Sequence, residues 1–345
     1  MLLDECPVPV VLAPLAGGPS TPELAAAVSD AGGLGFLAAG YLSAAELAAR
    51  IARTRELTTQ TFGVNLFVPQ TAGDPEALKA YAQRLGSEAA KAGQRLGELR
   101  TDDDDWTAKL ALLAETPVPL VSFTFGCPPG DVIGRLRDSG SEVWVTVTSV
   151  EEARQAQSAG ADALVVQGFE AGGHRGGFTD TDDATGLLAL LQAVAHAVSL
   201  PLVAAGGIAT GHGLAAVLAA GARAGALGSA FLLCPEAGTA QVHRAALTRP
   251  QPTALTRAFT GRLARGLRNR FLSEHSSFAP SAYPQIHHLT APLRAHGRAV
   301  GDPDLVNLWA GQAYALSRSE PAAEIVRRVA EEARAALRRA TEFLD

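Results

Sequence analysis

The 345-residue sequence is poor in cysteine, in positive charge and in long hydrophobic runs. Its three cysteines show no disulfide framework, its histidines show no HxH or HExxH spacing, and no metal site is expected. This cysteine usage predicts a reducing, cytoplasmic location. No segment approaches the ~20 apolar residues that cross a bilayer. Residues 1–9 contain acids and prolines in place of a cationic and an apolar stretch, so no secretory signal is expected.

The charge balance excludes two classes of partner. The chain has 29 Lys and Arg against 35 Asp and Glu, a formal charge of −6. Neither a nucleic acid nor an anionic membrane is therefore expected to bind, because both require clustered cations. The composition is 47% hydrophobic, which supplies the apolar surface for a large core. We expect one large domain with inserted segments.

Eight short apolar runs alternate with longer segments of helical period, a pattern typical of βα units around a parallel sheet. Most runs are continuously apolar, as expected for strands that are covered on both faces. The count predicts a (β/α)8 TIM barrel, which needs about 250 residues and accepts insertions. The predicted strands are Val10–Ala16, Leu34–Ala39, Phe62–Val68, Leu120–Gly126, Val143–Ser149, Ala163–Gly168, Leu202–Gly207 and Ala226–Leu232.

Helix-capping signals agree with this alternation. Thr21 precedes a proline, and Ser43 and Ser149 precede segments rich in Ala and Glu, so each residue is expected to begin a helix. Gly160 is the expected end of the helix that follows Ser149. A last helix is expected over about 320–344.

Two long segments interrupt the repeat and are predicted to form a smaller helical and loop-rich subdomain over the barrel mouth. The first contains a predicted helix over Pro75–Leu99 and an acidic run, Asp102–Asp105, interpreted as a solvated helix start. The predicted subdomain consists of residues 69–115 and 235–310, and the predicted barrel of 1–68 and 116–234, completed by the C-terminal helix in 311–345.

Glycine pairs accompany the last two predicted strands. Gly206 and Gly207 end the seventh strand, and Gly228 precedes Ser229 in the eighth. Glycine lets backbone amides approach a phosphate closely, and barrels hold phosphorylated cofactors at these two strands. Either pair alone is equally well explained by a tight turn. Together they favour a phosphate site.

A glycine-rich loop, GFEAGGHRGGF at Gly168–Phe178, follows the sixth predicted strand. Gln167 leaves the strand, and His174 and Arg175 stand among five glycines. Histidine suits a general base because its ordinary pKa lies nearest neutrality. The alternative is a solvent-exposed loop histidine without a role.

Two further polar features have two interpretations each. Asn65 lies inside an apolar strand, where its amide bonds either a planar heteroaromatic ligand or a neighbouring strand end. Arg262, Arg265, Arg268 and Arg270 lie close together in an acidic chain. They contact either an anionic cofactor or substrate, or carboxylates in ordinary salt bridges.

These motifs together resemble the nitronate monooxygenases, formerly called 2-nitropropane dioxygenases, and among them class II. The resemblance covers nearly the whole chain, and the QGxEAGGHxG element is specific to this family and its flavin relatives. The shared elements are APLAGG at 13–18, GVNLF at 63–67, VVQGFEAGGHRGG at 165–177, AAGGI at 204–208, LGSAF at 227–231, GRLARGLRNRF at 261–271 and LWAGQ at 308–312.

The resemblance implies a barrel with a smaller helical domain that holds FMN non-covalently. It implies oxidation of alkyl nitronates, such as propionate 3-nitronate, by O₂ to a carbonyl compound and nitrite through a flavin semiquinone. His174 is then the base that removes the α-proton of a neutral nitroalkane, whereas a nitronate needs no base. The implied FMN contacts are Asn65, Gln167, Gly172, Gly207 and the backbone of Ala226, Leu227, Gly228 and Ser229.

Two other functions remain as alternatives. An NAD(P)H-dependent flavin reductase of the enoyl-acyl-carrier-protein reductase or quinone reductase type shares the barrel and a similar loop, although no GxGxxG follows a strand here. The second alternative is a barrel that binds a phosphorylated ligand and catalyses no reaction. Leu15 and Leu263 replace residues usual in the family, so the preferred nitronate stays open, as does homo-oligomerisation.

Overall fold

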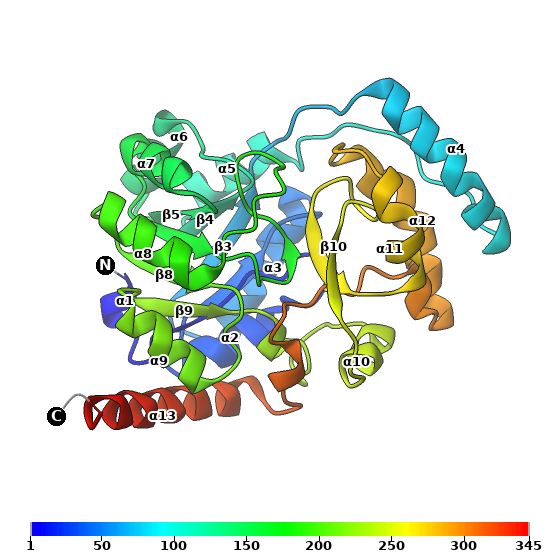
Figure 1. Ribbon diagram of the computed structural model, residues 1–345. Helices are drawn as coiled ribbons and strands as arrows, with labels where there is room; N and C mark the ends of the chain where they lie inside the picture. The colour runs from blue at the N-terminus through cyan, green and yellow to red at the C-terminus, as the bar shows by residue number, and fades with distance from the viewer. Residues whose placement is uncertain (1, 344–345) are drawn as a thin grey trace.

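A computed structural model describes residues 2–343, and eight parallel strands form its centre (Figure 1). The strands are β1 (Val10–Leu12), β2 (Gly35–Ala38), β3 (Phe62–Phe67), β4 (Leu120–Thr124), β5 (Glu142–Val147), β6 (Ala163–Gln167), β8 (Leu202–Ala205) and β9 (Ala224–Leu227). They pair in the order β1-β9-β8-β6-β5-β4-β3-β2. Leu34 closes the ring between the two end strands, because it exchanges backbone hydrogen bonds with Val10 and Leu12. The predicted (β/α)8 barrel is confirmed.

The eighth strand lies earlier in the chain than the sequence predicts. β9 pairs with β1 through Gly225 and Leu227, and the chain then leaves the sheet at Gly228. Ser229–Phe231 forms a 3₁₀ turn, η1, in place of the predicted end of the strand. Gly228 and Ser229 are therefore beyond the strand, at the mouth of the barrel.

Helices cover the outside of the barrel, and the predicted caps are present. The side chains of Thr21, Ser43 and Ser149 each accept a backbone hydrogen bond at a helix start, and Gly160 ends its helix with φ +97°. The covering helices are α2 (Pro22–Asp30), α3 (Ala44–Leu57), α5 (Trp106–Glu115), α6 (Gly130–Asp138), α7 (Val150–Ala159), α8 (Leu187–Ala197), α9 (Gly211–Ala219) and α13 (Ala322–Thr341), with a short α1 (Leu2–Glu5) near the start of the chain.

A second group of elements lies beside the barrel mouth (Figure 1). Its core contains Tyr81, Phe259, Phe271 and Ile286. We call this group the lid. It consists of α4 (Pro75–Lys91), α11 (Arg270–His275), α12 (Gln285–Val300), β10 (Thr253–Thr256) and β11 (Ala264–Leu267); nearby lie α10 (Gln241–Leu247), η2 (Ser276–Phe278), η3 (Pro303–Leu305) and η4 (Tyr314–Leu316).

The expected subdomain segment 69–115 is divided between the two parts of the structure. α4 ends at Lys91, short of the predicted Leu99, and Gly93 follows with φ +61°. α4 packs against α12 in the lid, whereas α5 packs against α3 and α6 on the barrel. The segment between α4 and α5 thus returns the chain from the lid to the barrel.

A two-residue strand, β7 (Gly173–His174), connects the glycine-rich loop to the lid. It pairs antiparallel with β11, with His174 opposite Ala264 and Gly173 opposite Arg265. β10 extends this small sheet on the other side of β11. The loop after β6 is therefore held by the barrel at one end and by the lid along its middle.

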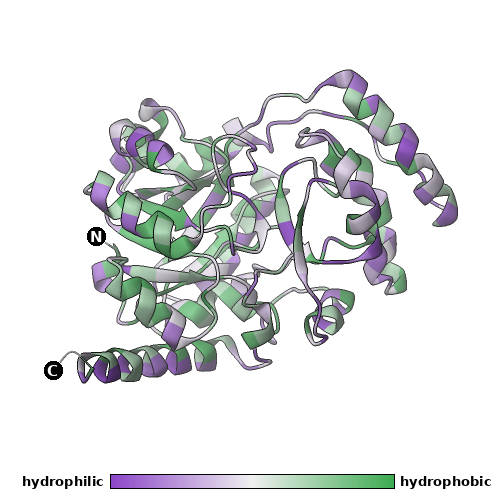
Figure 2. Ribbon diagram, viewed as in Figure 1, coloured by the Kyte–Doolittle hydropathy of each residue, from purple (hydrophilic) through white to green (hydrophobic). Residues whose placement is uncertain are grey.

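Hydropathy follows this arrangement. Figure 2 shows hydrophobic residues along the barrel strands and hydrophilic residues on the outer surfaces of α4 and α13. Phe36, Phe123 and Trp144 are among the largest fully buried side chains. Within residues 2–343, no helix combines the length and the apolar character needed to cross a membrane.

Candidate active site

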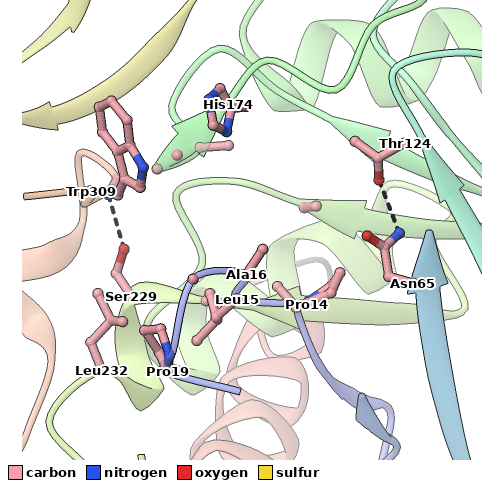
Figure 3. A pocket seen from close by; sticks show the side chains of 18 of the residues that line it. Pro14, Leu15, Ala16, Pro19, Asn65, Thr124, His174, Ser229, Leu232 and Trp309 are labelled. Carbon is pink, nitrogen blue, oxygen red and sulfur yellow. Dashed lines mark hydrogen bonds between the residues drawn. The ribbon is translucent and has the colours of Figure 1, made fainter. Parts of the chain in front are cut away.

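A cavity of about 510 Å³ lies at the carboxyl ends of the barrel strands, next to the lid. This is the end at which barrel enzymes assemble their sites. In Figure 3, His174 and Trp309 lie on one side of the pocket, Leu15 and Ala16 on the other, and Asn65 at one end. The predicted site residues that line it are Asn65, Gln167, Gly172, His174, Gly207, Ala226, Gly228 and Ser229.

One part of the wall is formed by Gly206, Gly207, Gly228 and Ser229, which we call the glycine cradle. Gly206 and Gly207 have φ values of +109° and +70°, which residues with a side chain rarely adopt. A Cβ on Gly206 would lie 3.0 Å from the backbone nitrogen of Ala171. α9 begins shortly after these residues, so its N-terminus is close to the cradle. Exposed backbone amides beside a helix N-terminus favour a phosphate.

Leu227 has a different environment from its predicted neighbours. Its side chain is fully buried in the core between the barrel and its helices, because alternate residues of a strand point to opposite sides. Its carbonyl accepts a hydrogen bond from the backbone of Ala13. Ala226, one position earlier, lines the cavity.

Asn65 makes the contact to a neighbouring strand that the sequence allowed, and one of its side-chain atoms is left over. Its Nδ2 donates to the hydroxyls of Ser122 and Thr124, at 2.9 and 3.0 Å, on the neighbouring strand β4. Its Oδ1 has no partner within residues 2–343, and Figure 3 shows this oxygen directed toward the pocket. The amide is thus fixed by the sheet and presents one acceptor to a ligand.

Gln167 uses its side-chain amide within the protein. Its Nε2 donates to the carbonyl of His174 at 3.0 Å, and its Oε1 accepts from the backbone of Gly176 at 2.8 Å. Gly172 allows the same loop to approach residues 310–311, since a Cβ there would lie 2.4 Å from the nitrogen of Gly311. Both residues line the cavity, and both shape the loop that carries the histidine.

His174 lies at the junction of barrel and lid. Its ring contacts Phe125, Tyr283 and Trp309 edge to face, with centroid separations of 5.5, 5.8 and 5.5 Å. Its Nε2 is 2.9 Å from the hydroxyl of Thr260. Burial, assisted by nearby arginines, lowers the pKa of His174 to about 3. The imidazole is therefore neutral near pH 7.

The arginines singled out in the sequence do not line the cavity. Arg175, Arg262 and Arg265 are buried and donate to backbone carbonyls of the glycine-rich loop or of the residue before it. Arg270 makes two ion pairs in the lid, as the salt-bridge alternative expected, and Arg268 is exposed. Three of these cations thus fix the loop, a role that neither sequence interpretation included.

Two aromatic residues in the cavity wall have strained backbones. Tyr41, after β2, and Phe125, after β4, have φ values of +69° and +77°. Such conformations are uncommon outside glycine and concentrate at functional sites. Sequence reasoning missed both residues, because an ordinary aromatic residue after a strand carries no sign of its backbone conformation.

The acidic run Asp102–Asp105 helps to hold Tyr41 in place. Oδ1 of Asp104 accepts from the backbone nitrogen of Tyr41 at 2.8 Å, and Oδ2 pairs at 2.8 Å with Lys109, which is fully buried. The run does precede helix α5, as expected. Asp104, however, is a partly buried structural carboxylate, so the interpretation of the run as merely solvated is incomplete.

The lid contributes polar groups that the sequence did not single out for the cavity. His287 stacks on Tyr41 with ring centroids 4.1 Å apart, and Arg294 follows on the same helix, α12. Both line the cavity, as does Thr260. The sequence did contain a signal for this pair: His287 and Arg294 are seven residues apart, so on a helix they lie on the same face.

A flavin mononucleotide fits this set of donors and acceptors. The glycine cradle would hold the phosphate, and the free Oδ1 of Asn65 would accept a hydrogen bond from the ring system. Apolar residues including Leu15 and Ala16 would cover a flat ring. The cavity volume suits a cofactor together with a small substrate.

The similarity of the chain to known proteins extends over the barrel and the lid. The family model described as nitronate monooxygenase matches residues 2–332. A nitronate monooxygenase of Pseudomonas aeruginosa is 42% identical over 340 residues, which is 94% of this chain and 96% of that protein. One of Paraburkholderia phytofirmans is 39% identical, over 97% of this chain and 94% of that protein.

Two solved structures are similar to the chain over nearly its whole length. The chain superposes on nitroalkane oxidase from Streptomyces ansochromogenes with a TM-score of 0.96, at 51% identity and over 99% of each chain. FabK from Thermotoga maritima gives a TM-score of 0.78 at 27% identity, over 99% of this chain and 97% of that one.

Proposed function

The chain belongs to the nitronate monooxygenase family, a family of flavin-dependent oxidoreductases, and we propose that it binds FMN in the cavity at the barrel mouth. With FMN bound, it oxidises alkyl nitronates, such as propionate 3-nitronate, with O₂ to a carbonyl compound and nitrite. The observation that supports this best is the placement of a neutral histidine, His174, in the same cavity as the glycine cradle and the free acceptor of Asn65.

We infer the ring tautomer of His174 from the hydrogen bonds of its neighbour Thr260. The hydroxyl of Thr260 donates to the carbonyl of Arg262 at 3.3 Å, so it accepts from Nε2–H of His174 at 2.9 Å. Nδ1 then carries the lone pair. A neutral nitroalkane beside His174 would lose its α-proton to Nδ1, which leaves the nitronate with the electron pair of the broken C–H bond.

The surroundings of His174 keep its imidazole neutral, the form that accepts a proton, but the same burial lowers its affinity for that proton. Phe125, Tyr283 and Trp309 enclose the ring and exclude water from its faces. When bound, FMN supplies the redox chemistry that couples oxidation of the nitronate carbon to the reduction of O₂. The chain's own residues supply the binding site, the base and the dry environment.

The activity is tested by mixing purified, flavin-loaded protein with a preformed nitronate and following oxygen uptake and nitrite. Nitrite formation well above that of free FMN is expected. Identification of the released flavin by chromatography tests the choice of FMN. If NADH or NADPH bleaches the flavin rapidly without oxygen and no nitrite forms from a nitronate, the reductase alternative is correct.

The role of His174 is tested by His174→Ala. We expect kcat/KM for neutral nitroethane to fall by about 100-fold or more, the usual contribution of a general base. With preformed ethyl nitronate the loss should stay within a few fold, because no proton is removed. His212→Ala, which changes an exposed histidine of α9 outside the cavity, is the matched control. Equal losses with both substrates would mean that His174 binds the anion instead.

A further inference from the structure

Arg294 is a buried cation whose charge is not balanced by the protein. The residue is 6% exposed, and within residues 2–343 no carboxylate lies within ion-pairing distance of it. Asp104, which bonds the backbone of Tyr41, is already paired with Lys109, and Asp102 contacts His288. A buried charge without a counter-charge is costly, so its retention requires an explanation.

The guanidinium of Arg294 is held in place by neutral acceptors only. Nε donates to the hydroxyl of Thr290 at 3.0 Å, and Nη2 donates to the carbonyl of His287 at 2.7 Å. Among the described residues, the hydrogen bonds of the guanidinium come from Nε and Nη2 and none from Nη1, and the side chain lines the cavity. Nε and Nη2 of the guanidinium are therefore fixed by α12, and Nη1 is free for a ligand.

The free guanidinium belongs to a different part of the cavity from the base and the cradle. Arg294 bonds His287, which stacks on Tyr41 after β2. The cradle follows β8 and β9, and His174 lies beyond Tyr283, whose ring is 5.8 Å from His174 and 6.3 Å from His287. A substrate with its reacting carbon at His174 would thus present a more distant part of its chain to Arg294.

We infer that Arg294 is a specificity-determining residue that binds a second anionic group of the substrate, a carboxylate remote from the nitronate. This inference rests on the proposed nitronate oxidation. An arginine fork matches the planar geometry of a carboxylate and is always charged. Arg298, one helical turn later, also lines the cavity and adds positive charge at the same end. Nitronates with an uncharged chain lack the group that would neutralise Arg294.

The test compares two nitronates that differ only at the far end, propionate 3-nitronate and propyl 1-nitronate. Arg294→Met keeps much of the length of the side chain and removes its charge. We expect kcat/KM for propionate 3-nitronate to fall by roughly 100-fold, as for loss of one partner of a buried charged hydrogen bond. For propyl 1-nitronate we expect a change of less than about threefold, with the same flavin content as wild type. Arg294→Lys should retain part of the preference.

Arg84→Met is the matched control, because it removes an exposed lid arginine that does not line the cavity. It should leave the preference between the two nitronates unchanged. The inference is overturned if Arg294→Met loses both activities equally, if neither activity changes, or if the variant loses its flavin. If wild type forms no nitrite from either nitronate, the proposed function fails instead.

A second measurement covers the case in which Arg294→Met does not fold. Propionate and its uncharged analogue propionamide are compared as competitive inhibitors of wild type against propyl 1-nitronate. Propionate should bind at least about tenfold more tightly, since only it supplies a charge to Arg294. Equal inhibition by the two compounds would contradict the inference.

Discussion

Thr260 illustrates how a residue without chemistry of its own can decide the protonation of another. Its hydroxyl lies between Nε2 of His174 and the carbonyl of Arg262, so it directs the proton of the imidazole to Nε2. The lone pair on Nδ1 depends on this arrangement. Thr260 is therefore a positioning residue for the proposed base.

Thr260→Val tests this role because valine has the same shape but no hydroxyl. Loss of the tautomer preference should lower kcat/KM for neutral nitroethane by about tenfold, within the range of one hydrogen bond to a reacting group. The rate with ethyl nitronate should change little, and Thr260→Ser should behave like wild type. If the valine variant is slow with both substrates, Thr260 has a structural role. If it is slow with neither, Thr260 does not position the base.

The chemistry-bearing residues that the sequence identified were those with an unusual local context. Asn65 inside an apolar strand and His174 inside a glycine-rich loop both line the cavity. Tyr41 and Arg294 do so as well, but they sit in ordinary segments of a turn and a polar helix. Their importance comes from what lies beside them in space, and that information is absent from local sequence.

At the scale of secondary structure, the glycine cradle depends on two backbone conformations that follow β8. Gly206 and Gly207 turn the chain with positive φ values and bring it against Ala171 in the glycine-rich loop. The turn after one strand and the loop after another thus form a single surface. A side chain at Gly206 would disturb both.

Gly206→Ala should therefore weaken flavin binding. A Cβ there would lie 3.0 Å from the backbone nitrogen of Ala171 and would hold alanine at φ +109°. Strain of this kind costs about 1–3 kcal/mol, so the dissociation constant of FMN should rise by about tenfold or more. Fluorescence titration of the flavin-free protein measures it.

Gly134→Ala provides the control for that substitution. Gly134 lies in α6, and a Cβ there would meet no atom within 4 Å. Alanine should leave FMN binding unchanged and raise the free energy of unfolding by up to about 1 kcal/mol. Full flavin retention by Gly206→Ala would show that the cradle tolerates a side chain.

The elements differ in how far the sequence could predict them. Each of the eight barrel strands is a buried apolar run, and each was found, although β9 was placed too late because Ala224 and Gly225 are weakly apolar. β7 has only two residues and exists because β11 pairs with it. Such a strand has no periodic signal of its own.

At the scale of the whole molecule, buried neutral histidines gather where the lid meets the barrel. His174, His243 and His287 all line the cavity. Burial lowers the pKa of His174 to about 3 and that of His243 to about 4, and it lowers the pKa of His287 well below its ordinary value. The folded protein therefore binds fewer protons than the unfolded chain below about pH 6.5.

Stability should accordingly fall as the pH decreases from 6.5 toward these lowered pKa values. Each such histidine contributes about 1.4 kcal/mol per pH unit, or about 2 kcal/mol between pH 7 and pH 5. Urea unfolding at the two pH values measures the loss for the flavin-loaded protein. His243→Gln should lose about 2 kcal/mol less than wild type, and His212→Ala as much as wild type. A glutamine variant that is as acid-sensitive as wild type would contradict this account.

The pairing of β7 with β11 has a consequence for protein engineering and for the divergence of relatives. His174 belongs to the barrel loop, but its strand partner, Thr260 and Arg294 all come from residues 253–300 of the lid region. A lid exchanged between two such enzymes would transfer the partner of the base together with the proposed specificity residue. Substrate range and proton transfer would therefore change together when the lid is exchanged. A chimaera would keep both only if β11 of the incoming lid still paired with the glycine-rich loop of the original barrel.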